Sequence, residues 1–128
     1  MNNQLRSPLG RVRGLGSAKG GTDHWWLQRV TAVALVILML LFVGYVLSLL
    51  GGGYERAADV IGSPIAGSVS ILMVIALFWH LKLGGQVIIE DYVHHEGTKL
   101  VAVLALTFAC IAVGLVSVLA VLSLVVGG

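Results

Sequence analysis

The stretch VTAVALVILMLLFVGYVLSLL, residues 30–50, contains no charged residue and decides the fold class. A helix needs about 20 apolar residues to cross the roughly 30 Å hydrocarbon core of a bilayer, and helices satisfy their own backbone hydrogen bonds in lipid. Two further segments qualify: residues 64–89, which include His80 and Lys82, and the uncharged residues 100–126. The sequence therefore predicts three transmembrane helices, at about residues 25–50, 64–91 and 99–126.

The composition of the whole chain supports this prediction. The 128 residues are 58% hydrophobic and 11% charged, with a mean hydropathy of +0.99, whereas soluble domains average roughly 25% charged residues. We therefore expect an all-α integral membrane protein, with residues 1–128 forming a single membrane-anchor domain. Three helices bury little surface against one another, so we also expect a partner subunit to complete the helix bundle.

The distribution of charge predicts the orientation in the membrane. Residues 1–29 hold one acid, Asp23, against five basic residues, Arg6, Arg11, Arg13, Lys19 and Arg29. An excess of positive charge keeps a flanking segment in the cytoplasm. We therefore expect residues 1–24 to form a cytoplasmic arm, the loop around residues 51–64 to lie outside, and the C-terminus to lie in the periplasm.

His80 is the residue of the second span that most needs a functional explanation. It lies well inside a span that begins at Pro64 and ends near Asp91, and an ionisable group at such depth is by default a functional hypothesis. A neutral imidazole there suits a proton relay, a hydrogen bond to another helix, or an axial bond to haem iron. Gly84, one turn further on the same face, would leave room for a flat macrocycle, but it would equally suit close helix packing.

Asp91 and Tyr92 follow where the second span leaves the membrane. A tyrosine hydroxyl can donate a hydrogen bond to a quinone carbonyl, and a neighbouring carboxylate can help to supply the protons that quinone reduction consumes. The pair equally suits an interfacial tyrosine beside a solvated acid. Arg29 is expected at the start of the first helix, at roughly the level of Asp91, where it either snorkels or binds a buried anion.

The other polar residues in and after the second span are not assigned to a site. Lys82 lies about 200° around the helix from His80, on the opposite face, and needs snorkelling or an acidic partner from another chain. His94, His95 and Glu96 are interpreted as a solvated loop rather than a metal site, because they offer no helical pair of ligands four residues apart.

Two segments, HWWLQRVTA (residues 24–32) and HLKLGGQVIIEDYVH (residues 80–94), resemble the small hydrophobic membrane anchor of succinate dehydrogenase, respiratory complex II. The resemblance extends over the whole chain, with three spans, a basic N-terminal arm, a glycine four residues after the histidine, and an Asp-Tyr pair beyond it. Its detail is similar to the alphaproteobacterial and mitochondrial branch of that family.

The resemblance implies that His80 is one axial ligand of haem b, the other coming from the companion anchor, the cytochrome b556 subunit. It implies that Tyr92 hydrogen-bonds a quinone, with ubiquinone favoured, and that Asp91 lies beside that site. Arg29 and His24 would lie near the haem propionates or the quinone. Metal binding would be confined to the haem iron at His80.

The resemblance also implies the assembly in which the chain works. A flavoprotein would oxidise succinate and an iron–sulfur subunit would relay electrons, while this chain, itself not catalytic, would hold both on the bacterial inner membrane and help to form the quinone site. Membrane lipids would surround it, and no contact with nucleic acid is expected.

Two other classes of function remain open from the residues alone. A stand-alone b-type cytochrome needs two haem ligands from one chain, and the other histidines are too near the water to pair with His80, although a homodimer could supply two. A transporter or channel subunit would use His80 and Lys82 as an ion path, but such proteins have broken helices or inverted repeats, and the sequence has neither feature.

Overall fold

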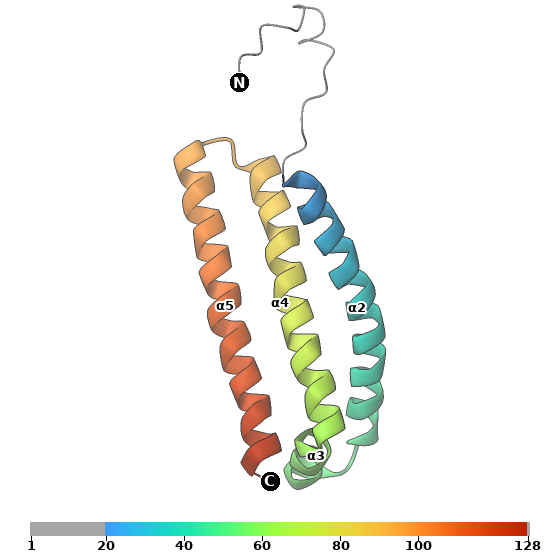
Figure 1. The fold of residues 1–128 in the computed structure, drawn as a ribbon. Helices are drawn as coiled ribbons and strands as arrows, with labels where there is room; N and C mark the ends of the chain where they lie inside the picture. The colour runs from blue at the N-terminus through green and yellow to red at the C-terminus, as the bar shows by residue number, and fades with distance from the viewer. Residues whose placement is uncertain (1–19, 128) are drawn as a thin grey trace, which may run out of the picture.

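The computed structural model describes residues 20–127 of the chain. They form four helices, α2 (Gly21–Ser48), α3 (Gly53–Gly62), α4 (Pro64–Tyr92) and α5 (Glu96–Gly127) (Figure 1). Three of them, α2, α4 and α5, are long and apolar enough to cross a membrane, so the prediction of an all-helical protein with three spans is confirmed. Most of the expected cytoplasmic arm, with Arg6, Arg11, Arg13 and Lys19, lies outside the described residues and stays a prediction.

The three long helices contain 28, 29 and 32 residues. At about 1.5 Å per residue, each is longer than the roughly 30 Å hydrocarbon core. Both termini of each helix can therefore extend beyond the hydrocarbon into the interfacial region, which places Tyr92 and Glu96 near water when the middle of each helix lies in the middle of the bilayer.

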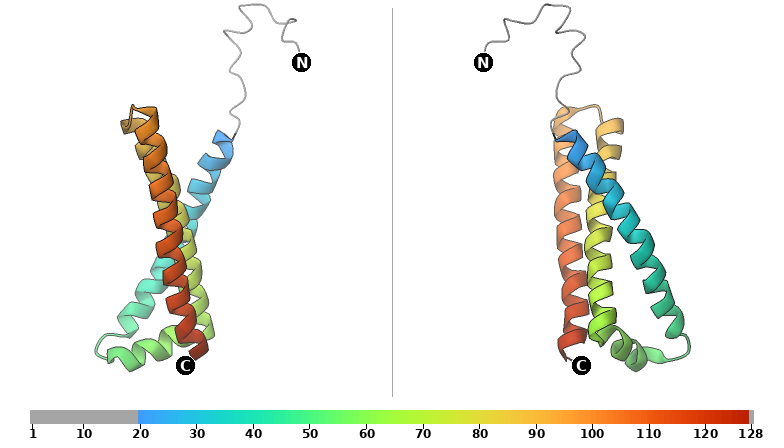
Figure 2. Two further views of the ribbon diagram at one scale, coloured as in Figure 1. Left: turned by 90° about the vertical axis from the view of Figure 1, so that its left-hand side faces the viewer. Right: turned by 45° about the vertical axis from the view of Figure 1, so that its right-hand side comes forward.

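Helix α4 is the central element of the described chain. It runs antiparallel to α5 and beside it, while α2 crosses α4 obliquely (Figures 1 and 2). Helix α2 crosses α4 along their middle parts and lies apart from it at the end of the bundle where α3 lies (Figure 2). His80 lies in the part of α4 that contacts α2.

The start of α4 agrees with its sequence. Pro64 is the first helical residue and Ser63 is the N-cap, whose hydroxyl accepts a hydrogen bond from the amide of Ala66 at 3.4 Å. Proline suits this position because the first amides of a helix have no partner within it, and the serine oxygen satisfies one of these amides.

Small residues bring α4 and α5 close together. A Cβ added at Gly85 would lie 2.7 Å from Cδ2 of Leu106, and one added at Gly114 would lie 3.3 Å from the ring of Phe78. Gly67 is more tightly enclosed, because its added Cβ would collide with Val125 and lie 3.1 Å from the backbone oxygen of Ile61. Close approach at small residues is a typical way for helices to associate in lipid, where the hydrophobic effect gives no drive.

The segment between the first two spans differs from its prediction. We expected a loop at residues 51–64, whereas the structure contains the ten-residue helix α3, lying across the end of the bundle against α4 and α5 (Figure 1). Gly51 and Gly53 have φ angles of 83° and 70° and form the turn that precedes it. The helix forms because Val60 and Ile61 bury part of their surface while Glu55 and Asp59 stay exposed, an amphipathic division that is stable at an interface.

The described chain buries few side chains. The buried residues of α4 and α5 are Ala66, Gly67, Ser70, Met73, Leu83 and Cys110, and α2 has none. Large apolar side chains are exposed along all three spans. Such a surface requires lipid or other membrane helices around it.

Replacing Gly67 by alanine should weaken the packing of α4 on α5. The added methyl group meets Val125 and a backbone oxygen, and such overpacking costs roughly 1–3 kcal/mol. Thermal denaturation of the detergent-solubilised complex measures the loss. The double variant G67A/V125A should recover part of it, because the second change removes the colliding methyl groups. If the stability loss of the double variant equals the sum of the losses of the two single variants, the contact between these residues is contradicted.

Candidate functional site

The imidazole of His80 faces α2. Its Nδ1 lies 3.2 Å from the backbone oxygen of Gln28 and 3.0 Å from Oγ1 of Thr31. Because a carbonyl oxygen can only accept, the contact with Gln28 requires Nδ1 to carry the ring proton and to donate it. The hydrogen-bond network therefore assigns a proton to Nδ1.

The other ring nitrogen of His80 is left for a different partner. Nε2 makes no hydrogen bond within residues 20–127, and the ring as a whole is partly buried. In a neutral ring protonated at Nδ1, Nε2 carries a lone pair. It can accept a hydrogen bond or bind a metal ion.

Gly84 lies one turn beyond His80 and also faces α2. A Cβ added there would meet only Nε2 of Gln28, at 3.6 Å, which is an ordinary contact distance. At the next residue, Gly85, an added Cβ would lie within 2.7 Å of Leu106. An added methyl group at position 85 would thus require Leu106 to shift, whereas one at position 84 would fit without a shift.

Asp91 and Tyr92 form the end of α4. The side chain of Tyr92 is 78% exposed, and Asp91 is exposed as well. Neither makes a side-chain hydrogen bond within the part of the chain that the structure describes, whereas Glu90 accepts one from Nε2 of Gln86 at 2.7 Å. At about 1.5 Å per residue, Tyr92 lies about 18 Å along the helix from His80. The two sequence-predicted sites are therefore separate regions of one helix.

Arg29 lies deeper than the sequence suggested. We expected it at the helix start and level with Asp91, but α2 begins two turns earlier, and the neighbouring residue Gln28 contacts His80. The preceding residues contain no proline and simply continue the helix. The guanidinium carbon of Arg29 lies 4.0 Å from the centroid of the Trp25 ring, one turn back, so a cation–π contact holds its charge on the side of the helix start.

His24 lies one turn before Gln28 on the same helix. Its Nε2 is enclosed and has no hydrogen-bond partner among residues 20–127. Buried polar atoms in proteins almost always have a partner. The unpaired nitrogen therefore points to a group that the described residues do not include.

Lys82 lies on the side of α4 away from α2. It lines a hollow of about 440 Å³ between α4 and α5, together with apolar residues and Thr107. No acidic side chain of the described chain lines this hollow. The structure thus separates Lys82 from His80, as the helical spacing predicted.

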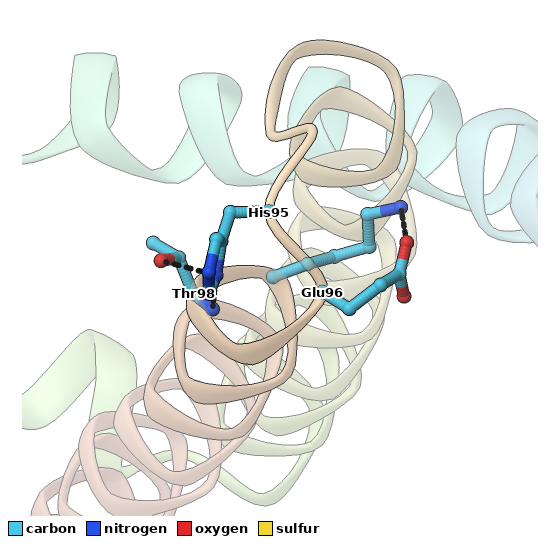
Figure 3. Close-up of polar contacts among 4 residues, drawn as sticks. His95, Glu96 and Thr98 are labelled. Carbon is cyan, nitrogen blue, oxygen red and sulfur yellow. Dashed lines mark hydrogen bonds and ion pairs between the residues drawn. The ribbon is translucent and has the colours of Figure 1, made fainter.

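His95, after the end of α4, contacts the beginning of α5 (Figure 3). Nδ1 of His95 lies 3.4 Å from both the amide nitrogen and Oγ1 of Thr98, and it accepts the amide proton as a helix cap does. Glu96 pairs with Lys99 at 3.1 Å. Glu96 is the first residue of α5 rather than part of a loop, and among residues 20–127 no group of three potential ligands gathers around a metal site.

Sequence reasoning missed Gln28 and Thr31. Thr31 is a single hydroxyl in an apolar span, and its ordinary interpretation is a hydrogen bond to its own helix, which it also makes, to the oxygen of Leu27 at 2.8 Å. The contribution of Gln28 comes from its backbone, which no side-chain pattern reveals. The available indication was the shared helical face of His24, Gln28 and Thr31, with spacings of four and three residues.

Known proteins are similar to this chain over most of its length. Residues 3–114 match the family described as succinate dehydrogenase/fumarate reductase transmembrane subunit. The succinate dehydrogenase hydrophobic membrane anchor subunit of Paracoccus denitrificans is 35% identical over 98 residues, which cover 77% of this chain and 75% of the relative. That of Rickettsia bellii is 33% identical over 93 residues, covering 73% and 74%.

A third relative is the succinate dehydrogenase membrane anchor subunit of Reclinomonas americana, which is 36% identical over 88 residues, covering 66% of this chain and 73% of the relative. The match to the family extends across all of α2, α3 and α4 and through most of α5. The chain therefore belongs to the family of succinate dehydrogenase hydrophobic membrane anchor subunits.

Proposed function

We propose that this membrane anchor supplies His80 as one axial ligand of haem b and contributes Tyr92 and Asp91 to the site where quinone is reduced. The observation that carries the proposal is that Nδ1 of His80 donates to α2, while Nε2 has no hydrogen-bond partner among residues 20–127. The chain itself performs no succinate oxidation, which belongs to the partner flavoprotein.

The residues around His80 fit a haem. Histidines that bind metals usually donate their second ring nitrogen to a carbonyl or carboxylate oxygen, which fixes the tautomer and the ring direction. The backbone oxygen of Gln28 fills this role for His80. Gly84, one turn beyond His80, carries no side chain, although a Cβ there would meet only Nε2 of Gln28, at 3.6 Å. When bound, haem would supply a one-electron centre inside the membrane.

The second axial ligand has to come from another chain. His94 and His95 lie beyond the end of α4, more than three turns from His80, and Nε2 of His24 is enclosed within the chain. The proposed source is the companion anchor, the cytochrome b556 subunit. This arrangement favours a haem shared with a companion anchor over a haem bound by this chain alone. Family membership favours the companion anchor over a second copy of this chain.

Tyr92 and Asp91 suit a quinone site because both are exposed at the end of the helix and have no partner within the described chain. The Tyr92 hydroxyl would donate a hydrogen bond to a quinone carbonyl, and Asp91 would help to carry protons from water to the site. Ubiquinone is the proposed quinone. The iron–sulfur subunit would deliver electrons to this end of the bundle.

Arg29 and His24 would serve the same region. Arg29 follows Gln28, whose backbone oxygen contacts His80, so its charge is placed to pair with a haem propionate or with an anion at the quinone site. The unpaired Nε2 of His24 would receive its partner from the bound cofactor or from a companion chain.

The orientation follows from the charge of the N-terminal segment. Its basic residues would hold the N-terminus in the cytoplasm, which places the end of α4 on the cytoplasmic side and the C-terminus in the periplasm. The flavoprotein and the iron–sulfur subunit would then dock beside Asp91 and Tyr92. The location proposed for the complex is the bacterial inner membrane.

Replacing His80 by leucine should abolish or alter the low-spin b-type spectrum of the purified complex, because leucine cannot bind iron. The reduced-minus-oxidised absorbance difference, measured per bound flavin, reports the change. His94→Leu is the matched control, since His94 is exposed beyond α4, and it should leave the spectrum unchanged. An unaltered spectrum in the His80→Leu complex would eliminate His80 as a ligand.

Replacing Tyr92 by phenylalanine should slow quinone reduction while sparing succinate oxidation with an artificial acceptor that takes electrons before the quinone site. The lost hydrogen bond is worth roughly 0.5–1.5 kcal/mol, which corresponds to a fall of roughly two- to ten-fold. Tyr54→Phe is a matched control, because Tyr54 in α3 is also 78% exposed but lies at the other end of the bundle. Equal loss of both activities, or loss of neither, would contradict the assignment of Tyr92.

Replacing Arg29 by lysine keeps the charge but removes the forked donors. A role at a bound anion predicts weaker quinone reduction or a lower haem midpoint potential, because a cation held close to the haem favours its reduced form. Arg56→Lys in α3, where Arg56 is exposed, is the control for the exchange of arginine for lysine away from the proposed site. If both quantities stay at wild-type values, Arg29 only stacks on Trp25 and snorkels.

A further inference from the structure

The contact between His80 and α2 involves two oxygen atoms, one from the backbone and one from a side chain. Nδ1 lies 3.2 Å from the Gln28 oxygen and 3.0 Å from Oγ1 of Thr31. We propose that Thr31, together with the Gln28 carbonyl, is a positioning residue that fixes the tautomer and direction of the His80 ring and thereby tunes a metal bound at Nε2. This inference rests on the proposed role of His80 as a haem ligand.

The hydroxyl of Thr31 is arranged to accept rather than to donate. It can give its single proton to the backbone oxygen of Leu27 at 2.8 Å or to that of Gln28 at 3.0 Å. With its proton used in this way, its lone pairs remain for the Nδ1–H group of His80. Both oxygens that approach Nδ1 are then acceptors, and the ring proton is shared between them.

The opposite tautomer would be unfavourable in this setting. A proton on Nε2 would leave a lone pair on Nδ1 facing the Gln28 carbonyl oxygen at 3.2 Å, so two acceptors would meet without a proton between them. Water cannot relieve such a contact in the hydrocarbon core, where each unsatisfied polar group costs several kcal/mol. The two oxygens therefore keep Nε2 unprotonated and available to iron.

Thr31 provides a second hydrogen-bond acceptor for the Nδ1–H group of His80, beside the Gln28 carbonyl oxygen. In a helix the Gln28 carbonyl oxygen also accepts a hydrogen bond from the amide four residues later, so it accepts from two donors at once and binds each less strongly. A second acceptor on the same Nδ1–H group draws the proton further from the ring and increases the electron donation of Nε2. Stronger donation stabilises ferric relative to ferrous iron, and its loss should raise the midpoint potential of the haem.

Thr31→Val tests this role, because valine has nearly the same shape but no hydroxyl. In the assembled complex we expect haem to remain, with a midpoint potential higher than wild type and a changed electron paramagnetic resonance spectrum of the low-spin ferric haem. Thr31→Ser restores the hydroxyl and should restore both properties. Redox titration and low-temperature spectra are the measurements.

Thr107→Val is the matched control. Thr107 also lies in a span and bonds to its own helix, to the oxygen of Val103 at 2.8 Å, but it lines the hollow on the other side of α4. Thr107→Val should leave the potential and the spectrum unchanged. An equal shift in both variants would overturn the proposal, because it would reflect a general loss of packing.

The remaining outcomes separate this inference from the proposed function. A wild-type potential and spectrum in Thr31→Val, with the haem signal lost in His80→Leu, would overturn the role of Thr31 and leave His80 as the ligand. A haem signal retained in His80→Leu would overturn both. Failure of Thr31→Val and of Thr31→Ala to assemble would also overturn the positioning role, because the hydroxyl would then be needed to hold α2 on α4.

Discussion

The core of a bilayer contains no water, so a polar side chain inside it must find its partners in protein or in a bound group. His80 finds two of its partners on α2, through one ring nitrogen. This contact joins α2 to α4, two helices that cross obliquely (Figure 2). With no buried residue in α2, its placement depends on this polar contact more than on an apolar core.

The packing of α4 on α5 has a different physical basis. Glycines at positions 67, 85 and 114 let the two helices approach until side chains of one touch the backbone of the other. Short contacts at small residues hold these two helices together, whereas α2 has no buried residue. The described chain therefore combines a closely packed pair, α4 and α5, with a third helix that contacts His80 through its N-terminal half.

The sequence could predict the spans because each is a long apolar run, with Lys82 as the one charged residue among residues 30–50, 64–89 and 100–126, and Pro64 after Ser63 marks the start of α4 closely. It could not predict α3, because a ten-residue amphipathic helix after three glycines is hard to distinguish from a polar loop. It also misplaced Arg29, because helix α2 continues through residues that carry no start signal. The residues His80, Asp91 and Tyr92 were identified from their depth in the membrane, and their roles rest on the proposal.

The oxygens that meet His80 were the least accessible to prediction. One belongs to the backbone of Gln28, and the other to Thr31, which also bonds to its own helix. Side-chain patterns indicate which face of a helix is polar, but not the rotation and crossing angle that bring a particular carbonyl within 3.2 Å of a ring nitrogen. That geometry depends on the tertiary structure.

The groups for which the described chain supplies no partner lie on one side of it. Nε2 of His80 has no hydrogen-bond partner among the described residues, Gly84 would accept a Cβ at an ordinary contact distance from Gln28, and Nε2 of His24 is enclosed without a partner among the same residues. All three belong to α2 or to the face of α4 that meets it, and α5 contributes none of them. The α5 side offers instead a largely apolar hollow with the single cation Lys82. Under the proposed function, a companion anchor that completes the haem site would pack along α2 and α4.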